Sequence, residues 1–188
     1  MIKIGLTGSI ASGKTTASKI ISRYNGPLFS ADKIVKKLYE QSKFRLIISK
    51  TFKLDINVNL KLQIKNKIKN DKNILKRLEK IIHPFVRKEM HFFVKKYKNQ
   101  KILFFEIPLL IESKLMNFFD TIIFIKSKKN LRLKRYKLKG GNEYFFNLLN
   151  NHQLKDVKKT KFCDHIVVNN GSILVLKKKL LNIIKIYA

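Results

Sequence analysis

Short apolar runs alternate with longer amphipathic stretches along the chain, and this alternation sets the expected order of elements. Residues 2–7 form an apolar run that ends at a glycine, which predicts a strand. A helical pattern starts at about Gly13 and stops at residues 25–27. Residues 28–30 form a second short strand, and another helical pattern begins near Asp32. The chain is therefore predicted to begin as strand, loop, helix, strand and helix.

The stretch from Lys43 to Lys98 has a helical pattern almost throughout. Pro84 interrupts this pattern. Because proline is favoured in the first turn of a helix, we expect a new helix to begin at Pro84, with His83 just before it.

Three more apolar runs predict strands, at residues 101–107, 121–125 and 165–168. The first two are largely apolar, which is typical of the buried centre of a parallel sheet. Because strands alternate with helices, the sequence predicts an α/β fold in which helices sandwich a parallel sheet of about five strands. With 188 residues and 45% apolar content, the chain is the size of one compact domain.

The last third of the chain carries further helical patterns. A basic helix is predicted over residues 128–139, a second helical pattern with polar interruptions covers 143–161, and a terminal helix follows Gly171. Gly140 and Gly141 separate the first two patterns. The glycine pair is either the hinge of a lid or a plain turn between helices, and the sequence favours neither.

The net charge of +30 raises the question of nucleic-acid binding. Only six of the 42 basic residues are arginine, and the lysines are spread along the whole chain. Lysine, asparagine, isoleucine and phenylalanine are abundant together, which is typical of drift toward AT-rich codons at tolerant surface positions. We therefore expect solvated basic faces and no nucleic-acid partner, although such a field would attract a polyanionic substrate.

The single cysteine, Cys163, excludes an intrachain disulfide and a four-thiolate zinc site, which fits a reducing compartment. Lysine or asparagine interrupts every apolar run well before the roughly 20 residues that cross a bilayer. The apolar stretch at residues 1–9 is too short for a signal peptide. We expect a cytoplasmic protein without membrane contact, and a monomer.

The strongest chemical signal is a full G-x-x-x-x-G-K-[ST] motif from Gly8 to Thr15, placed between a predicted strand and a predicted helix. Such a phosphate loop (P-loop) directs main-chain N–H groups at phosphate oxygens, and the following helix N-terminus adds partial positive charge. We expect Lys14 to bridge the β- and γ-phosphates of ATP and the Thr15 hydroxyl to bind Mg²⁺. The residues predicted to contact the nucleotide are Gly8, Ser9, Ile10, Ala11, Ser12, Gly13, Lys14, Thr15 and Thr16.

Two carboxylates follow strands whose ends should gather beside this loop. Asp32 could accept a proton from an attacking hydroxyl, hold a water on Mg²⁺, or cap the helix that it begins. We favour the catalytic role because it completes the site. Glu106 ends the third strand, where an acidic residue can orient Mg²⁺ through water.

The basic helix supplies candidates for stabilising the transferred phosphoryl group. Arg132, Arg135 and Lys139 could close over the nucleotide and neutralise the developing charge, or could be plain surface charges. Arginine is scarce in this chain and binds phosphate through a planar fork, so we expect Arg135 to be the catalytic cation.

With these residues in view, the chain resembles the dephospho-CoA kinases along nearly its whole length. SAD, HP and PLL-x-E occur in that order and are more specific than the P-loop alone. The segments that carry the resemblance are GLTGSIASGKTT, FSADKI, IIHPFVRKEM, EIPLLIES, RLKRYKLKGG and NNHQLKDVKKTKFCDHIVVNNG.

The resemblance implies transfer of phosphoryl from ATP to the ribose 3′-hydroxyl of dephospho-CoA, with Asp32 as the catalytic acid-base residue. Arg135 and Lys139 fall on the family's lid. Asn169 and Gly171 fall where the family holds the adenine of ATP. The positions matching acceptor-binding residues or the loop beside the site are Asp32, His83, Pro84, Arg87, Pro108, Leu109, Leu110 and Glu112.

The chain departs from the family pattern at two positions. Ser30 stands where the family usually has a first aspartate, and Lys139 stands where we expect a lid arginine, so residue 139 lacks the planar fork that makes bidentate phosphate contacts. Within one kinase domain we expect a core at about 1–40, 100–130 and 163–188, a helical acceptor-binding part at about 41–99, and a lid at about 131–155.

Two other functions stay open on the residues alone. A kinase for another small acceptor, such as a nucleoside monophosphate or a sugar, shares the P-loop but needs a different acceptor pocket. A nucleic-acid-dependent P-loop ATPase would use the high positive charge.

Overall fold

The computed structural model describes residues 1–71 and 73–187. The chain divides into two compact units. The core unit comprises Met1–Ser30 and Val94–Ala188, and the helical unit comprises Ala31–Phe93.

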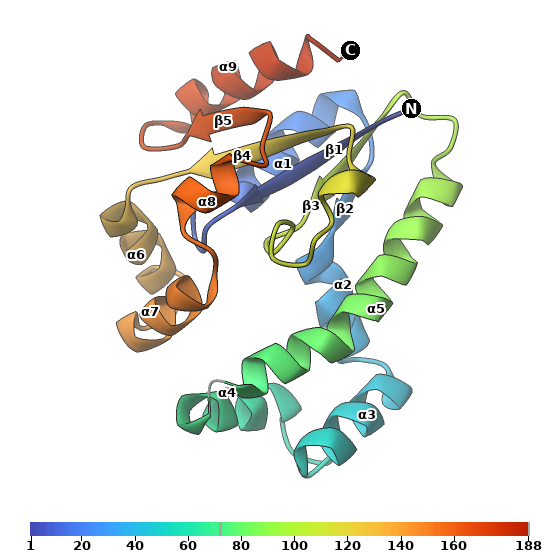
Figure 1. Cartoon of the computed structure of the whole chain (residues 1–188), viewed down its shortest axis with the longest axis vertical. Coiled ribbons are helices and arrows are strands. Elements are labelled where there is room, and N and C mark those ends of the chain that lie inside the picture. Colours follow the sequence, from blue (N-terminus) through green and yellow to red (C-terminus); the bar gives the residue numbers. More distant parts are fainter. Residues whose placement is uncertain (72, 188) are drawn as a thin grey trace. The chain divides into compact units, whose positions relative to one another are not determined.

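The core unit is built on a parallel sheet (Figure 1). In the described part of the chain the sheet has five strands in the order β2-β3-β1-β4-β5, and every neighbouring pair is parallel. The predicted five-stranded parallel sheet is therefore confirmed. The strands are β1 (Ile2–Gly8), β2 (Leu28–Ser30), β3 (Ile102–Glu106), β4 (Thr121–Lys126) and β5 (His165–Val168).

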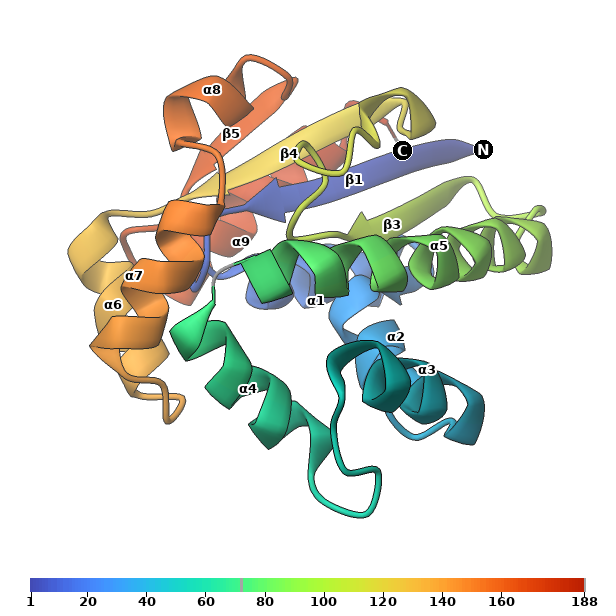
Figure 2. The ribbon, with the colours of Figure 1, turned by 60° about the horizontal axis from the view of Figure 1, so that its bottom comes forward.

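Both faces of the sheet are covered. Successive side chains of a strand point to opposite faces, so β1 packs against both covering layers. On one face, Ile4 and Leu6 of β1 belong to a buried cluster with residues of α1 (Lys14–Asn25) and α9 (Ile173–Ile184). On the other face, Gly5 lies against Leu110 and Phe119 of the β3–β4 connection. Helix α8 (Asp156–Thr160) contacts β4, and Figure 2 shows it across the sheet from α9.

Helices α6 (Lys129–Lys137) and α7 (Glu143–His152) lie between β4 and α8 in sequence, and the 3₁₀ helix η1 (Met116–Phe118) precedes β4. The helical pattern predicted over residues 143–161 forms two helices, α7 and α8, because residues 153–155 are not helical. The glycine pair makes a tight turn after α6, in which the N–H groups of Gly140 and Gly141 donate to carbonyls of the last helical turn.

The helical unit contains α2 (Ala31–Leu38), α3 (Ser42–Phe52), α4 (Leu60–Asn70) and most of α5 (Asn73–Lys96). Its core is aromatic at the centre. The Phe44 ring stacks edge-on against Tyr39 at 5.2 Å and Phe85 at 5.5 Å between ring centroids. Such pairs contribute about 0.5–1.5 kcal/mol beyond their area burial, so they fix α2, α3 and α5 within this unit.

The prediction that a helix begins at Pro84 is wrong, because Pro84 lies inside the continuous helix α5. An internal proline removes one main-chain hydrogen bond and costs about 3 kcal/mol. Leu78, Val86 and Met90 are buried on both sides of Pro84. Burying a side chain of this kind contributes about 1.5–3 kcal/mol, so packing of the helix face outweighs the local cost.

Among the described residues, no helix combines the length and apolar character needed to span a membrane.

Candidate active site

The phosphate loop joins β1 to α1 at the carboxyl edge of the sheet. Gly13 has a φ of +99° at the helix N-cap, and a Cβ placed there would lie 2.2 Å from Nδ2 of Asn169. Only glycine fits both this left-handed backbone and this close approach. Residues 9–12 close a turn in which the Ser12 N–H donates to the Ser9 carbonyl at 3.1 Å.

Lys14 folds back into the loop that it ends. Its Nζ donates to the carbonyls of Gly8 and Ser9, each at 2.9 Å, and the residue is only 8% exposed. A cationic amine is thus held inside a ring of main-chain groups, where low exposure strengthens its attraction for an anion.

Glu106 is the centre of a network of hydroxyl groups and is 1% exposed. Its Oε1 accepts from the Thr15 hydroxyl at 2.5 Å, and its Oε2 accepts from Ser18 at 3.3 Å and Ser30 at 3.1 Å. The end of β3 and the start of α1 are thereby linked. Ser30, the departure from the family pattern, is a donor to this carboxylate.

The Thr15 hydroxyl and the Glu106 carboxylate together fit a magnesium ion. Mg²⁺ prefers hard oxygen ligands and usually keeps several waters, so one or two protein groups are sufficient together with phosphate oxygens. The Thr15 hydroxyl and the Glu106 carboxylate are in direct contact beside the phosphate loop. Within residues 1–71 and 73–187 no cluster of three or more His, Cys, Asp or Glu could hold a metal.

Both arginines of α6 reach the phosphate loop. Arg135 donates to the Ser12 carbonyl at 3.4 Å and to the Asn169 carbonyl at 3.1 Å. Arg132 is buried and donates to the Ile10 carbonyl at 3.4 Å and to Oδ1 of Asn150 at 2.8 Å. Burial lowers the pKa of Arg132 despite the opposing effect of Asp156.

Lys139 lies beyond the end of α6 and is exposed, so the structure does not bring it to the loop as it does the two arginines. Its role on a lid stays a prediction. Asn169, by contrast, is buried next to the loop, where its Nδ2 donates to the Ser12 carbonyl at 2.8 Å. Gly171 is exposed, with open space around its Cα. Contact of either residue with adenine stays a prediction.

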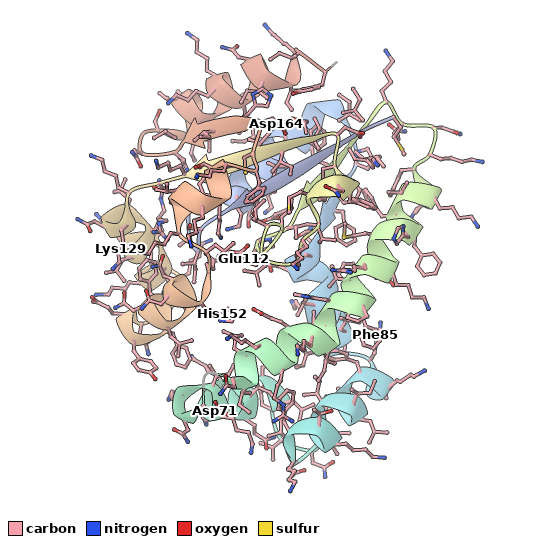
Figure 3. All side chains as sticks on the ribbon, viewed as in Figure 1. Asp71, Phe85, Glu112, Lys129, His152 and Asp164 are labelled. Atoms are coloured by element: carbon pink, nitrogen blue, oxygen red, sulfur yellow. The ribbon has the colours of Figure 1, made fainter. Side chains whose placement is uncertain are left out.

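The loop after β3 carries the predicted residues Pro108, Leu109, Leu110 and Glu112. The Pro108 carbonyl accepts from the Thr7 hydroxyl at 3.2 Å, and Leu110 is fully buried against Gly5. Figure 3 labels Glu112 in this loop. Its Oε1 forms an ion pair with Nζ of Lys159 at 2.6 Å and accepts from the Leu154 N–H at 3.1 Å.

Sequence reasoning missed three residues that lie at the site. Gln153 Oε1 accepts from the Ile10 N–H at 3.0 Å, Asp156 accepts a hydrogen bond from the Ser9 hydroxyl, and Lys159 is the fully buried partner of Glu112. They recur every third position, in a stretch whose polar interruptions were the only available signal.

The remaining predicted residues belong to the helical unit. Asp32 lies in the first turn of α2, directly after β2. Glu79, His83 and Arg87 follow one another at four-residue spacing on α5 and so share one face. Burial lowers the pKa of the His83 imidazole, Arg87 lowers it further, and Glu79 opposes both effects.

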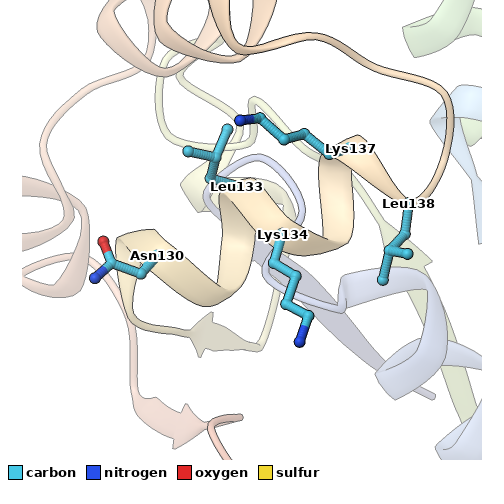
Figure 4. Close-up of a pocket in the computed structure, with 5 residues that line it drawn as sticks. All are labelled: Asn130, Leu133, Lys134, Lys137 and Leu138. Atoms are coloured by element: carbon cyan, nitrogen blue, oxygen red, sulfur yellow. The ribbon is translucent and has the colours of Figure 1, made fainter.

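A separate surface pocket of about 470 Å³ lies on α6 (Figure 4). The residues that line it are Asn130, Leu133, Lys134, Lys137 and Leu138. They include neither of the arginines that contact the phosphate loop, so we assign this pocket no part in nucleotide binding.

Comparison with known proteins identifies the family. The sequence profile described as Dephospho-CoA kinase matches residues 2–174. The chain belongs to the dephospho-CoA kinase family. The dephospho-CoA kinase of Fusobacterium nucleatum is 33% identical over 183 residues, which cover 94% of this chain and 93% of that protein.

Solved structures agree with membership of the dephospho-CoA kinase family. The dephospho-CoA kinase from Campylobacter jejuni superposes with a TM-score of 0.67 at 26% identity, covering 97% of this chain and 95% of that one. A protein from Thermus thermophilus gives a TM-score of 0.80 at 22% identity, covering 100% and 98% of the two chains. The latter likeness shows the fold alone.

Proposed function

We propose that this chain transfers the γ-phosphoryl group of ATP to the ribose 3′-hydroxyl of dephospho-CoA, giving coenzyme A and ADP. The observation that carries the proposal is the contact between Thr15 and Glu106 beside the Lys14 loop, in a member of the dephospho-CoA kinase family. A kinase needs little covalent chemistry from the protein, because catalysis rests on positioning and on charge stabilisation.

The phosphate loop holds the triphosphate in this proposal. Main-chain N–H groups within residues 8–16 surround the phosphates, and Lys14 moves its ammonium group from the Gly8 and Ser9 carbonyls to the β- and γ-phosphates. The low exposure of Lys14 supports this role, since a buried cation interacts strongly with a bound anion. Asn169 and Gly171 contact the adenine.

Thr15 would bind Mg²⁺ directly, with Glu106 or Asp32 acting through water. When bound, the ion neutralises charge on the β- and γ-phosphate oxygens. The three hydroxyl donors of Glu106 hold its carboxylate in one orientation, which keeps it ready to accept from a metal-bound water.

Asp32 accepts the proton of the attacking 3′-hydroxyl. Chain connectivity supports this role, because Asp32 follows Ser30 by two residues and two residues span at most about 7 Å. The Ser30 hydroxyl itself donates to Glu106. Arg135 stabilises the charge that develops on the transferred phosphoryl group, and its position on the Ser12 carbonyl supports this assignment.

The helical unit supplies the acceptor site, with His83, Pro84 and Arg87 on α5 as contacts. His83 and Arg87 share one helix face, so both could reach one anionic acceptor. Pro108, Leu109 and Leu110 of the loop after β3 are further proposed acceptor contacts, and residues 131–155 act as the lid. We further propose that the enzyme works as a monomer in the cytoplasm, which its one free thiol suits.

A panel of acceptors tests the function. The purified chain is incubated with ATP and Mg²⁺ and with dephospho-CoA, adenosine, nucleoside monophosphates, shikimate or simple sugars, and ADP release is followed. We expect dephospho-CoA to give a kcat/KM at least 100-fold above that of every other acceptor. A faster turnover of any other acceptor contradicts the proposal. A rise in ATP hydrolysis on adding RNA or DNA would instead support the ATPase alternative.

A further inference from the structure

Lys159 is a lysine with no exposed surface in a chain that places most of its lysines in solvent. Burying an ammonium group is costly unless a partner of opposite charge compensates it. The partner is Glu112, whose Oε1 lies 2.6 Å from the Lys159 Nζ. Apart from this ion pair, neither the ammonium group nor Oε2 of Glu112 has a hydrogen-bond partner in the described part of the chain. Loss of Glu112 would therefore leave the buried ammonium group without a compensating charge.

The ion pair joins two segments that are distant in sequence. Glu112 belongs to the loop after β3, and Lys159 belongs to α8. Glu112 also accepts from the Leu154 N–H at 3.1 Å, so it holds the non-helical residues before α8 as well as α8 itself. Residues 154 and 159 are thus both held by one carboxylate.

The same segment holds the first half of the phosphate loop. Gln153 accepts from the Ile10 N–H at 3.0 Å, and Asp156 accepts from the Ser9 hydroxyl. Ser9 and Ile10 lie four and three residues before Gly13, the N-cap of α1. Loop residues at which a ligand binds need outside support, because a displacement of about 1 Å can cost a factor of 100 in rate.

We propose that Lys159 is a positioning residue for the nucleotide: through Glu112 it fixes residues 153–156, which in turn hold Ser9 and Ile10 of the phosphate loop. Lys159 does not touch the nucleotide in this arrangement. The inference rests on the nucleotide-binding part of the proposed function and is independent of which acceptor is used.

The role assigned to Glu112 differs from contact with the acceptor. If Glu112 supports the loop, its neutralisation weakens nucleotide binding as strongly as neutralisation of Lys159 does. If Glu112 contacts dephospho-CoA directly, only the Glu112 variant weakens acceptor binding. The two roles therefore separate in paired measurements of the two ligands.

The experiment compares Lys159→Met, Glu112→Gln and the double variant, with Lys158→Met as the matched control on an exposed neighbour. Calorimetry measures the dissociation constant of each protein for a non-hydrolysable ATP analogue in the presence of Mg²⁺. KM is measured separately for ATP and for dephospho-CoA. We expect each single variant to raise the nucleotide dissociation constant about 10-fold or more. The double variant should bind the nucleotide as tightly as the single variant with the lower affinity, because both substitutions remove the same contact. The KM for dephospho-CoA should stay within about 2-fold, and Lys158→Met should match the wild type.

Several results would overturn the inference. These are wild-type nucleotide affinity in both single variants, multiplication of the two effects in the double variant, or a raised acceptor KM confined to Glu112→Gln. If Lys159→Met does not fold, Gln153→Met removes the acceptor of the Ile10 N–H and leaves the ion pair intact. An unchanged nucleotide affinity in Gln153→Met then contradicts the role of the segment. Absence of kinase activity on dephospho-CoA would refute the proposed function. The nucleotide dissociation constants of the variants would still decide this inference.

Discussion

Replacement of Glu106 by glutamine separates the chemical role of this carboxylate from its structural role. Glutamine preserves the shape of the side chain and removes its charge. In the wild type, hydroxyls of Thr15, Ser18 and Ser30 all donate to the carboxylate. A glutamine amide can accept through its oxygen only, so at least one hydroxyl must turn and accept from the new NH₂ group.

The expected change in folding stability is small because two effects oppose each other. A hydrogen bond to a charged group contributes about 1.5–3 kcal/mol and a neutral one about 0.5–1.5, so three bonds lose roughly 3 kcal/mol in all. The variant also avoids burying an ionised carboxylate, a penalty of several kcal/mol. We therefore expect a net change within about 2 kcal/mol, or a shift in Tm of less than about 8 °C for a chain of this size.

Turnover, in contrast, should fall about 100-fold or more, because a preorganised charge next to the reacting phosphates is lost. The assay follows ADP release with saturating ATP, Mg²⁺ and dephospho-CoA, and thermal unfolding is measured on the same samples. Glu40→Gln, an exposed substitution, is the control and should change neither quantity. A kcat within 3-fold of wild type, or a loss that merely follows unfolding, would refute the role of Glu106.

Three further predictions follow from particular groups. Lys14→Met should lower kcat/KM for ATP at least about 100-fold, while Lys19→Met, an exposed change on the same helix, should leave it unchanged in the same assay. Burial lowers the pKa of His83, so the unfolded chain binds more protons than the folded one just below pH 6.5. The free energy of unfolding should therefore fall as the pH drops from 7 to 5. Denaturation of His83→Gln should show a free energy of unfolding that changes less with pH over the same range. Burial raises the pKa of the Cys163 thiol to about 12, so iodoacetamide should leave the folded protein unmodified between pH 6 and 9 and should label it only after denaturation.

The sheet could be predicted because its information is local. Residues 102–105 and 122–125 are continuous apolar runs, and all positions of β3 are buried. The start predicted at Pro84 failed for the opposite reason. A local preference indicated a helix start, whereas Leu78, Val86 and Met90 on the buried face of α5 decide the outcome through tertiary packing.

The site divides in the same way. The motif from Gly8 to Thr15 carries its own chemistry, and Glu106 could be found from its position at the end of a strand. Lys159 could not be found, since nothing in the local sequence distinguishes it from the exposed Lys158 beside it. Its burial depends on Glu112, which belongs to a different part of the chain and meets it only in the folded protein.

The most direct test of the proposed reaction compares dephospho-CoA with its analogue lacking the ribose 3′-hydroxyl, each incubated with ATP, Mg²⁺ and the purified chain. Products are identified by phosphorus NMR and mass spectrometry. We predict that dephospho-CoA gives coenzyme A bearing a new 3′-phosphate and that the deoxy analogue gives no phosphorylated product. Phosphorylation of the deoxy analogue, or failure to phosphorylate dephospho-CoA at all, would contradict the account.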